Sequence, residues 1–192
     1  RLCRDWSSDV CSSDLILVHP YVENVKVELS VDNKIIIEIK EKNIVASLLV
    51  NEKIYLLSEK YELLPSLMNL QNSDYPLITN SELTEVNLNE YYSIPELKKA
   101  FRIIESIKIV DENLLKKLSE VNLRKGKDIV LNFTGWNAIV IIGKNNIEEK
   151  IIYLSHARTS NEIKEILNYS DYIDLRYKES IYFGKNMNTG NL

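Results

Sequence analysis

The sequence predicts an α+β fold with a mostly antiparallel sheet and a few packed helices. Three observations lead to this prediction. Short β-branched segments such as residues 25–29 and 35–39 alternate with polar residues and are separated by turn signals. Residues 94–109 and 147–157 instead show patterns typical of helices. The chain has 192 residues and is 45% hydrophobic, which suits one globular domain or two small ones.

Residues 1–14 differ in composition from everything that follows. They combine serine and aspartate with both cysteines of the chain, Cys3 and Cys11, and they lack the apolar core of a secretory signal. A polar tail and a Cys3–Cys11 disulfide are two interpretations, whereas the spacing does not suit a zinc site. A third interpretation fits better, because DWSSDVCSSDL back-translates into a DNA adapter used for short-read sequencing. We therefore expect residues 1–14 to be non-native and the natural chain to extend upstream of Leu15.

Residues 22–80 are expected to be mainly strand. Residues 25–29 and 35–39 flank a turn at residues 31–34, which predicts a hairpin whose β-branched residues face inward. Residues 44–65 predict two strands around a turn at residues 51–53. The stretch 66–80 is expected to be irregular and to end in a strand fragment at residues 76–78.

The second half of the chain predicts helices and strands in turn. Ser93 is the expected N-cap of the helix over residues 94–109, with Pro95 in its first turn. The remaining expected elements are a short helix at 112–119, strands at 120–126, 128–135 and 137–143, and helices at 147–157 and 161–167.

The sequence offers little that suggests catalysis. His19 and His156 are separated by most of the chain and have no partner at metal-ligand or acid–base spacing. The sequence has no glycine-rich phosphate loop and no Gly-x-Ser-x-Gly element, and no cysteine follows Cys11. We predict no catalytic residues, no metal, no cofactor and no small-molecule substrate. Scattered carboxylates such as Glu148 and Glu149 leave an unrecognised enzyme as an alternative.

Charge and hydropathy give no support to nucleic-acid binding or to a membrane helix within these residues. The formal net charge of −4 gives no basis for nucleic-acid binding, which needs a clustered basic face. No apolar run reaches the roughly 18–20 residues that a membrane helix needs.

The most informative segment is YIDLRYKESIYF at residues 172–183. Its apolar and polar residues alternate, which predicts an amphipathic strand. One interpretation is an ordinary strand of the sheet. The other is a terminal edge strand that accepts a second chain by strand addition. Tyrosine and arginine would suit such an edge because both are enriched at interface hot spots.

Several segments, taken in order, resemble the bacterial cell-division family FtsQ, also called DivIB. HPYVENVKVELSVDNKIIIEIKEKNIVA resembles the end of a POTRA domain, and IYLLSEKYELLP and YPLITN resemble the segments that follow it. VIIGKNNIEEKI and YIDLRY resemble later motifs, and the order holds over residues 15–184. The chain departs from the family pattern at Asn43-Ile44 and at Ser58-Glu59.

The resemblance implies a partial POTRA domain at residues 15–46, an FtsQ-type β domain at 47–184 and a flexible tail at 185–192. It implies a non-enzymatic scaffold of septum formation that is held in the cytoplasmic membrane by one upstream helix, with this region on the periplasmic side. The implied partners are FtsB-like and FtsL-like division proteins, bound by strand addition to the last strand. The implied partner-binding residues are Asp174, Arg176, Tyr177, Lys178, Ser180 and Tyr182.

Another POTRA-containing protein is the remaining alternative. Outer-membrane assembly and secretion proteins usually carry several POTRA repeats followed by a transmembrane barrel. The sequence shows no second repeat and no run of barrel strands, which favours the division family.

Overall fold

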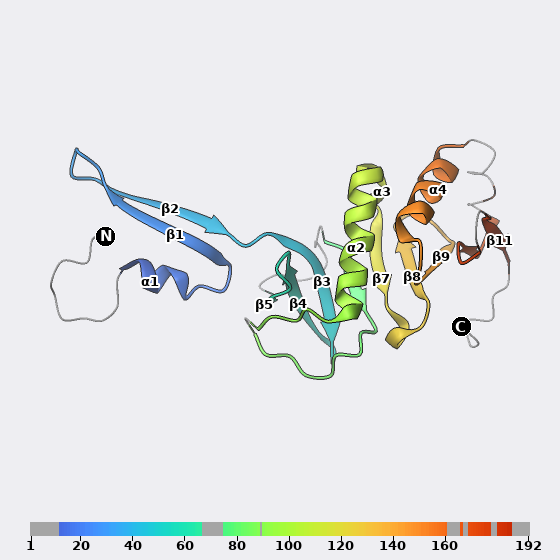
Figure 1. Cartoon of the computed structure of the whole chain (residues 1–192), viewed down its shortest axis with the longest axis horizontal. Coiled ribbons are helices and arrows are strands. Elements are labelled where there is room, and N and C mark those ends of the chain that lie inside the picture. The colour runs from blue at the N-terminus through green and yellow to red at the C-terminus, as the bar shows by residue number, and fades with distance from the viewer. Residues whose placement is uncertain are drawn as a thin grey trace.

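The computed structural model describes residues 12–66, 75–88, 90–160, 166, 169–177 and 180–185. These residues form two sheets of different size, a two-stranded ribbon and a nine-stranded sheet with helices (Figure 1). The predicted α+β fold is confirmed. The predicted helix at 161–167 falls almost entirely outside the described residues, as do most of segment 1–14 and of the tail at 185–192. Within the described residues, none of the helices combines the length and apolar character needed to cross a membrane.

The ribbon consists of β1 (Val22–Leu29) and β2 (Ile35–Glu41), preceded by the short helix α1 (Ser12–Leu17). The strands pair antiparallel with Val27 opposite Ile37, and the turn between them is closed by the Ser30 N–H, which donates to the Lys34 carbonyl at 2.8 Å. The hairpin prediction is confirmed. The predicted inward orientation of its isoleucines is wrong, because both faces of β2 are open and every residue of that strand is exposed.

The larger sheet is mixed. Its strands are β3 (Ile44–Val50), β4 (Lys53–Ser58), β5 (Leu63–Pro65), β6 (Leu77–Thr79), β7 (Leu118–Asn122), β8 (Ile129–Phe133), β9 (Ile139–Gly143), β10 (Tyr172–Asp174) and β11 (Tyr182–Gly184). They lie in the order β11-β10-β9-β8-β7-β6-β3-β4-β5. The pairs β3–β6, β6–β7 and β9–β10 are parallel, and the other neighbouring pairs are antiparallel.

The two sheets separate between β2 and β3. The domain boundary predicted between residues 46 and 47 lies inside β3, whose residues all belong to the larger sheet. The assignment of the ribbon to a POTRA domain stays a prediction.

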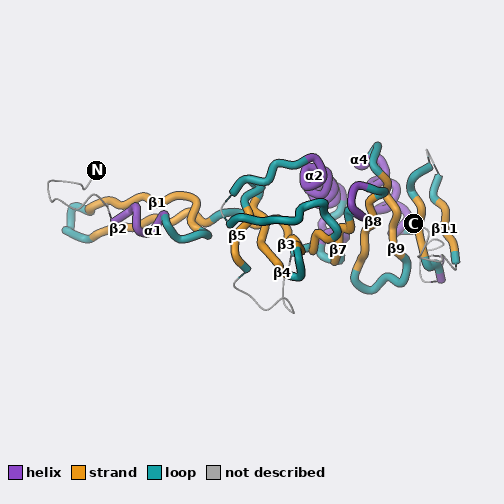
Figure 2. The backbone as a smooth tube through the Cα atoms, turned by 90° about the horizontal axis from the view of Figure 1, so that it is seen from below, coloured by secondary structure: helices purple, strands orange, loops and turns teal. Residues whose placement is uncertain are grey.

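Helices supply two of the crossovers that parallel neighbours require. α2 (Pro95–Val110) and α3 (Glu112–Leu115) connect β6 to β7, and α4 (Ile147–Thr159) connects β9 to β10. α2 and α4 lie on the same face of the sheet and contact each other (Figure 2).

Two helix boundaries differ from the prediction. The N-cap of α2 is Ile94, which has an extended backbone and makes no side-chain cap, so the assignment of Ser93 is wrong, whereas Pro95 opens the helix as expected. The predicted helix at 112–119 ends earlier, at Leu115. Leu118 already belongs to β7, where its side chain packs into the core and is only 5% exposed.

The core fills the space between the two helices and the sheet. It includes Leu48, Ile78, Leu97, Ile107 and Leu131, each fully buried. Burying a side chain of this size contributes about 1.5–3 kcal/mol relative to leaving it exposed. The same strands turn their alternate residues to the opposite face, where polar side chains of β7 and β8 reach solvent.

Candidate partner-binding edge

The last strand of the chain forms one edge of the nine-stranded sheet. Among the residues that the structure describes, β11 pairs with β10 alone, and β10 pairs with β9 on its other side. The sequence left two interpretations of residues 172–183, an ordinary strand of the sheet or a terminal edge strand, and for residues 172–174 the structure agrees with the first. β10 is internal and ends at Asp174, because the backbone after Leu175 leaves the sheet and returns as β11. The open edge that the sequence led us to expect exists, but β11 provides it.

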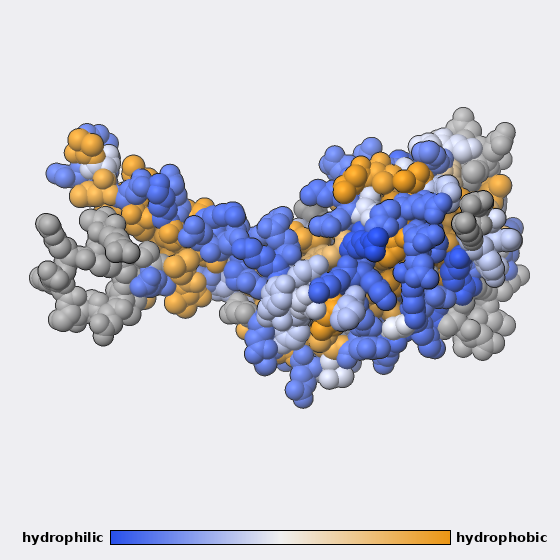
Figure 3. Space-filling view, viewed as in Figure 1, coloured by the Kyte–Doolittle hydropathy of each residue, from blue (hydrophilic) through white to orange (hydrophobic). Residues whose placement is uncertain are grey.

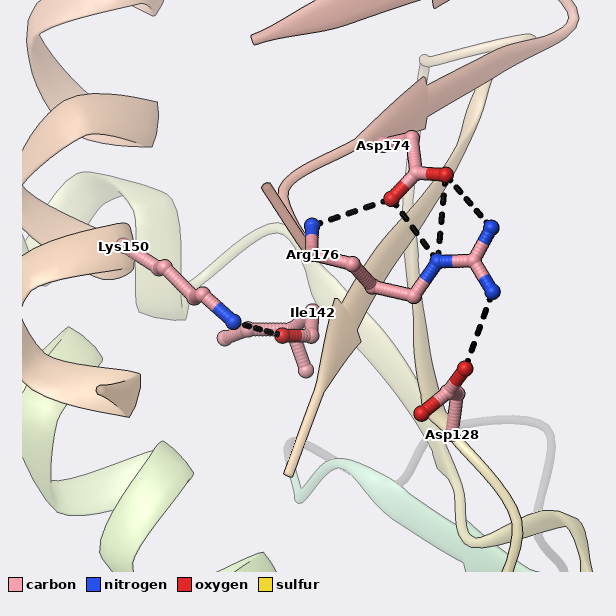
Figure 4. A network of polar contacts seen from close by, with 5 residues as sticks. All are labelled: Asp128, Ile142, Lys150, Asp174 and Arg176. Atoms are coloured by element: carbon pink, nitrogen blue, oxygen red, sulfur yellow. Dashed lines mark hydrogen bonds and ion pairs between the residues drawn. The ribbon is translucent and has the colours of Figure 1, made fainter. Parts of the chain in front are cut away.

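Asp174 closes the end of β10 and is only 4% exposed. Its carboxylate accepts the Arg176 backbone N–H at 2.9 Å, Nε at 3.0 Å and Nη2 at 2.6 Å (Figure 4). A buried carboxylate is costly unless it is paired and hydrogen-bonded, and these contacts meet both conditions. Asp174 therefore fixes the path of the chain where it leaves β10.

Arg176 also reaches a second carboxylate. Its Nη1 donates to Asp128 Oδ2 at 2.9 Å, which ties the segment to the β7–β8 connection (Figure 4). The two carboxylates raise the pKa of the guanidinium above its ordinary value. Gly143 has φ 72°, and a Cβ there would lie 3.1 Å from Arg176 Cγ, so glycine leaves room for the arginine stem.

Lys150 lies beside this network. Its Nζ donates to the Ile142 carbonyl at 2.8 Å, and the residue is 8% exposed (Figure 4). Burial lowers the pKa of the Lys150 ammonium, while Asp128 and Asp174 act in the opposite direction. The lysine thus joins α4 to β9 directly under the arginine.

Two tyrosines stand exposed at the edge. Tyr177 follows Arg176, and Tyr182 opens β11 opposite Asp174. Their ring centroids are 4.8 Å apart at an interplanar angle of 64°, and the residues are 56% and 52% exposed. This edge-to-face pair presents aromatic surface next to an open strand, a combination suited to contacts with another chain.

The other predicted site residues are placed as follows. Ser180 is exposed in the connection that leads to β11. Lys178 lies outside the described residues. The structure thus brings Asp174, Arg176, Tyr177 and Tyr182 together, with Asp174 buried and the tyrosines exposed.

A glycine in β11 allows this strand to lie close to β10. Gly184 lies opposite Tyr172, whose ring occupies the space that a Cβ at position 184 would need. The Asp171 N–H donates to the Gly184 carbonyl at 2.8 Å. Sequence reasoning missed β11 as a separate strand, although Gly184 directly after Tyr182-Phe183 is the signal that marks it.

The chemistry available at this edge is limited to a few kinds of group. In the part of the chain that the structure describes, no group of three or more His, Cys, Asp or Glu side chains is arranged to hold a metal ion. What the edge offers is main-chain hydrogen-bonding groups and aromatic surface, which suit an extended polypeptide.

Comparison with known proteins gives one informative relative. No family model matches the chain. The chain is similar to a bacterial division protein. It is 28% identical over 167 residues to the cell division protein FtsQ of Geobacter sp. (strain M21). The match covers 87% of this chain and 60% of that protein, so the chain spans less than two thirds of the relative's length. The similarity supports the FtsQ-like family that the ordered motifs indicated.

Proposed function

We propose that the chain is the extracytoplasmic part of a non-enzymatic, FtsQ-like cell-division scaffold. In this proposal, the C-terminal edge of its large sheet binds other division proteins. The observation that carries the proposal is the open edge of β11 beside the exposed pair Tyr177 and Tyr182. The similarity to a cell division protein supports the biological process.

The proposed mode of binding is strand addition. An antiparallel neighbour uses the N–H and C=O groups of alternate residues, so β11 keeps a second set that faces away from β10. A segment of an FtsB-like or FtsL-like protein would pair with this set. β11 has three residues, so main-chain bonds are few and the flanking aromatic side chains must supply much of the affinity and selectivity.

The six proposed site residues divide into two roles. Tyr177, Ser180 and Tyr182 are exposed and would contact the partner, together with Lys178. Asp174 and Arg176 would not contact the partner directly, because the carboxylate is buried and the guanidinium already has two carboxylate partners. Their contribution is to hold the backbone that carries Tyr177.

The ribbon fits a POTRA domain that continues upstream. The outer edge of β2 is open, and Ile35, Ile37 and Ile39 are each at least half exposed, giving apolar surface along the ribbon (Figure 3). A further strand would pair with that edge and reduce this exposure. In the proposal, the same upstream region carries the single membrane helix, and the relative is longer than the matched region.

Replacing Tyr177 with alanine tests the edge. We expect Tyr177→Ala to weaken binding of FtsB-like and FtsL-like segments from the same genome by about 2 kcal/mol, or roughly 30-fold, as measured by calorimetry. The matched control is Tyr91→Ala, since Tyr91 is 64% exposed and pairs with Glu62 near the other end of the sheet. Unchanged affinity for Tyr177→Ala would remove the residue from the site, and absence of binding by the wild type would refute the proposed function.

A further inference from the structure

The face of the large sheet opposite the helices carries a hollow of about 430 Å³. Its floor is formed by side chains of β7, β8 and β9, and its rim by the turn η2 (Arg124–Gly126). The lining residues are Asn80, Asn122, Arg124, Lys125, Lys127, Val130, Asn132 and Ile139. None of them belongs to the proposed partner-binding edge.

Three cations gather on one rim of the hollow. Arg124, Lys125 and Lys127 have no side-chain ion pair or hydrogen bond within the described part of the chain. The backbone holds them in place, because the Lys125 N–H donates to the Asn80 carbonyl at 2.8 Å and the Arg124 N–H to Asn122 Oδ1 at 3.0 Å. Arg124 and Lys125 both adopt positive φ, at 49° and 50°, so this turn is held in a conformation uncommon for such residues.

The floor combines amide groups with a carboxylate that is hydrogen-bonded to its neighbours. Asn80 Nδ2 donates to Asn122 Oδ1 at 3.0 Å. The Glu120 carboxylate beside the floor accepts bonds from Thr79, Asn122 and Asn132, which occupy its oxygens. The Oδ1 atoms of Asn80 and Asn132 accept no hydrogen bond from the described residues and are open to a ligand.

We propose that this hollow binds an acidic segment of another polypeptide in extended conformation. The asparagine amides can donate to and accept from peptide groups, as a peptide backbone requires. The rim cations match acidic side chains of such a segment. None of the described residues that line the hollow is aromatic, so they offer no ring for the stacking that sugars and bases use.

A titration of the ¹⁵N-labelled full chain tests the proposal. The probe is a short synthetic peptide that alternates glutamate and threonine, and the signals followed are the side-chain amides of Asn80, Asn122 and Asn132. We expect the chemical shifts of these amides to change as peptide is added and to reach a plateau at high peptide concentration. The matched glutamine–threonine peptide should bind at least about fivefold more weakly, because it lacks the charges that the rim would pair with.

A pair of charge-reversed variants localises the effect. Lys125→Glu with Lys127→Glu should weaken binding of the acidic peptide about tenfold. Lys98→Glu with Lys99→Glu makes the same change in net charge on exposed α2 residues of the opposite face, and it should leave the affinity unchanged. Equal losses in both variants, or signal changes that map away from the asparagines, would overturn the proposal. So would tighter binding of a single-stranded oligonucleotide than of the acidic peptide.

Discussion

At the scale of single residues, Asp174 is the one on which the candidate edge depends most. Asp174→Asn should lower the free energy of unfolding by about 2 kcal/mol, because removing a buried charge leaves Arg176 without its main partner. We expect less than the full cost of breaking a buried ion pair, because 33% of the Arg176 side chain is exposed and water can solvate its charge. Urea denaturation followed by circular dichroism measures the difference.

Asp128→Asn is the matched control for this change. Asp128 pairs with the same guanidinium, but its side chain is 36% exposed, so its loss should cost less than about 1 kcal/mol. Equal destabilisation by both variants would show that burial of Asp174 does not set the strength of the network.

Glu23 gives a prediction about pH. Hydrogen bonds from Lys40 and Lys60 hold the pKa of the Glu23 carboxyl at about 2, below its ordinary 4.5. A carboxyl whose pKa is depressed on folding stabilises the protein above its ordinary pKa, and this contribution is lost as the pH falls toward the folded value. The stability difference between wild type and Glu23→Gln should therefore be constant above pH 4.5 and shrink between pH 4.5 and about 2. Urea titrations across this range measure it, and a difference that persists at about pH 2 would contradict the ion-pair assignment.

The sequence identifies only some of the residues that build the site. Tyr177 and Tyr182 could be predicted because a strand pattern and aromatic character are local properties. Asp128 could not, since it lies 48 positions from Arg176 and only the packing of the β7–β8 connection brings the two together. The same holds for Gly143, whose role depends on an arginine that the sequence places far away.

At the scale of elements, α2 provides two isoleucines two positions apart with opposite environments. Ile107 is fully buried against the sheet, whereas Ile109 is 84% exposed. Ile107→Ala should lower the free energy of unfolding by about 3 kcal/mol, because it removes buried methyl groups and leaves a cavity. Ile109→Ala should change it by less than about 0.5 kcal/mol, because nothing packs on that side chain. Chemical denaturation measures both, and similar values would mean that α2 does not bury the face assigned to it.

The elements and the antiparallel hairpins were largely predictable, and the parallel pairing was not. The turn at Asn51 and Glu52 was expected from residue type, and both adopt the positive φ that a tight hairpin needs. The parallel pairs β3–β6, β6–β7 and β9–β10 join segments that are distant in sequence, so no local pattern indicates them. For the same reason, the sequence could not decide whether residues 172–183 hold an internal strand or an edge strand. The alternation of β10 was visible, but the later strand that covers it has three residues.

At the scale of the whole molecule, the two sheets are stabilised by different forces. The large sheet has helices over one face and a continuous apolar core. The ribbon meets it through polar contacts, with Lys60 bound to Glu23 and Lys42 Nζ at 2.7 Å from Glu62 Oε2. The Lys60 side chain is 58% exposed, so its pair with Glu23 contributes little and is screened by salt. The ribbon therefore depends on its own two strands, which alone are marginally stable in water.

This difference predicts separate opening of the two sheets. Amide hydrogens of Lys26 and Glu28 in β1, which face β2 in the antiparallel register, should exchange through local opening, several kcal/mol below the free energy needed to expose Leu131 in β8. Added salt should speed exchange in the ribbon without changing exchange in β8, because it screens the ion pairs at the joint and leaves the apolar core intact. Hydrogen exchange followed by NMR at low and high salt measures both effects. Equal protection of β1 and β8 at each salt concentration would instead show that the ribbon and the large sheet unfold as one unit. In that case the polar joint would couple the sheets far more strongly than two ion pairs imply.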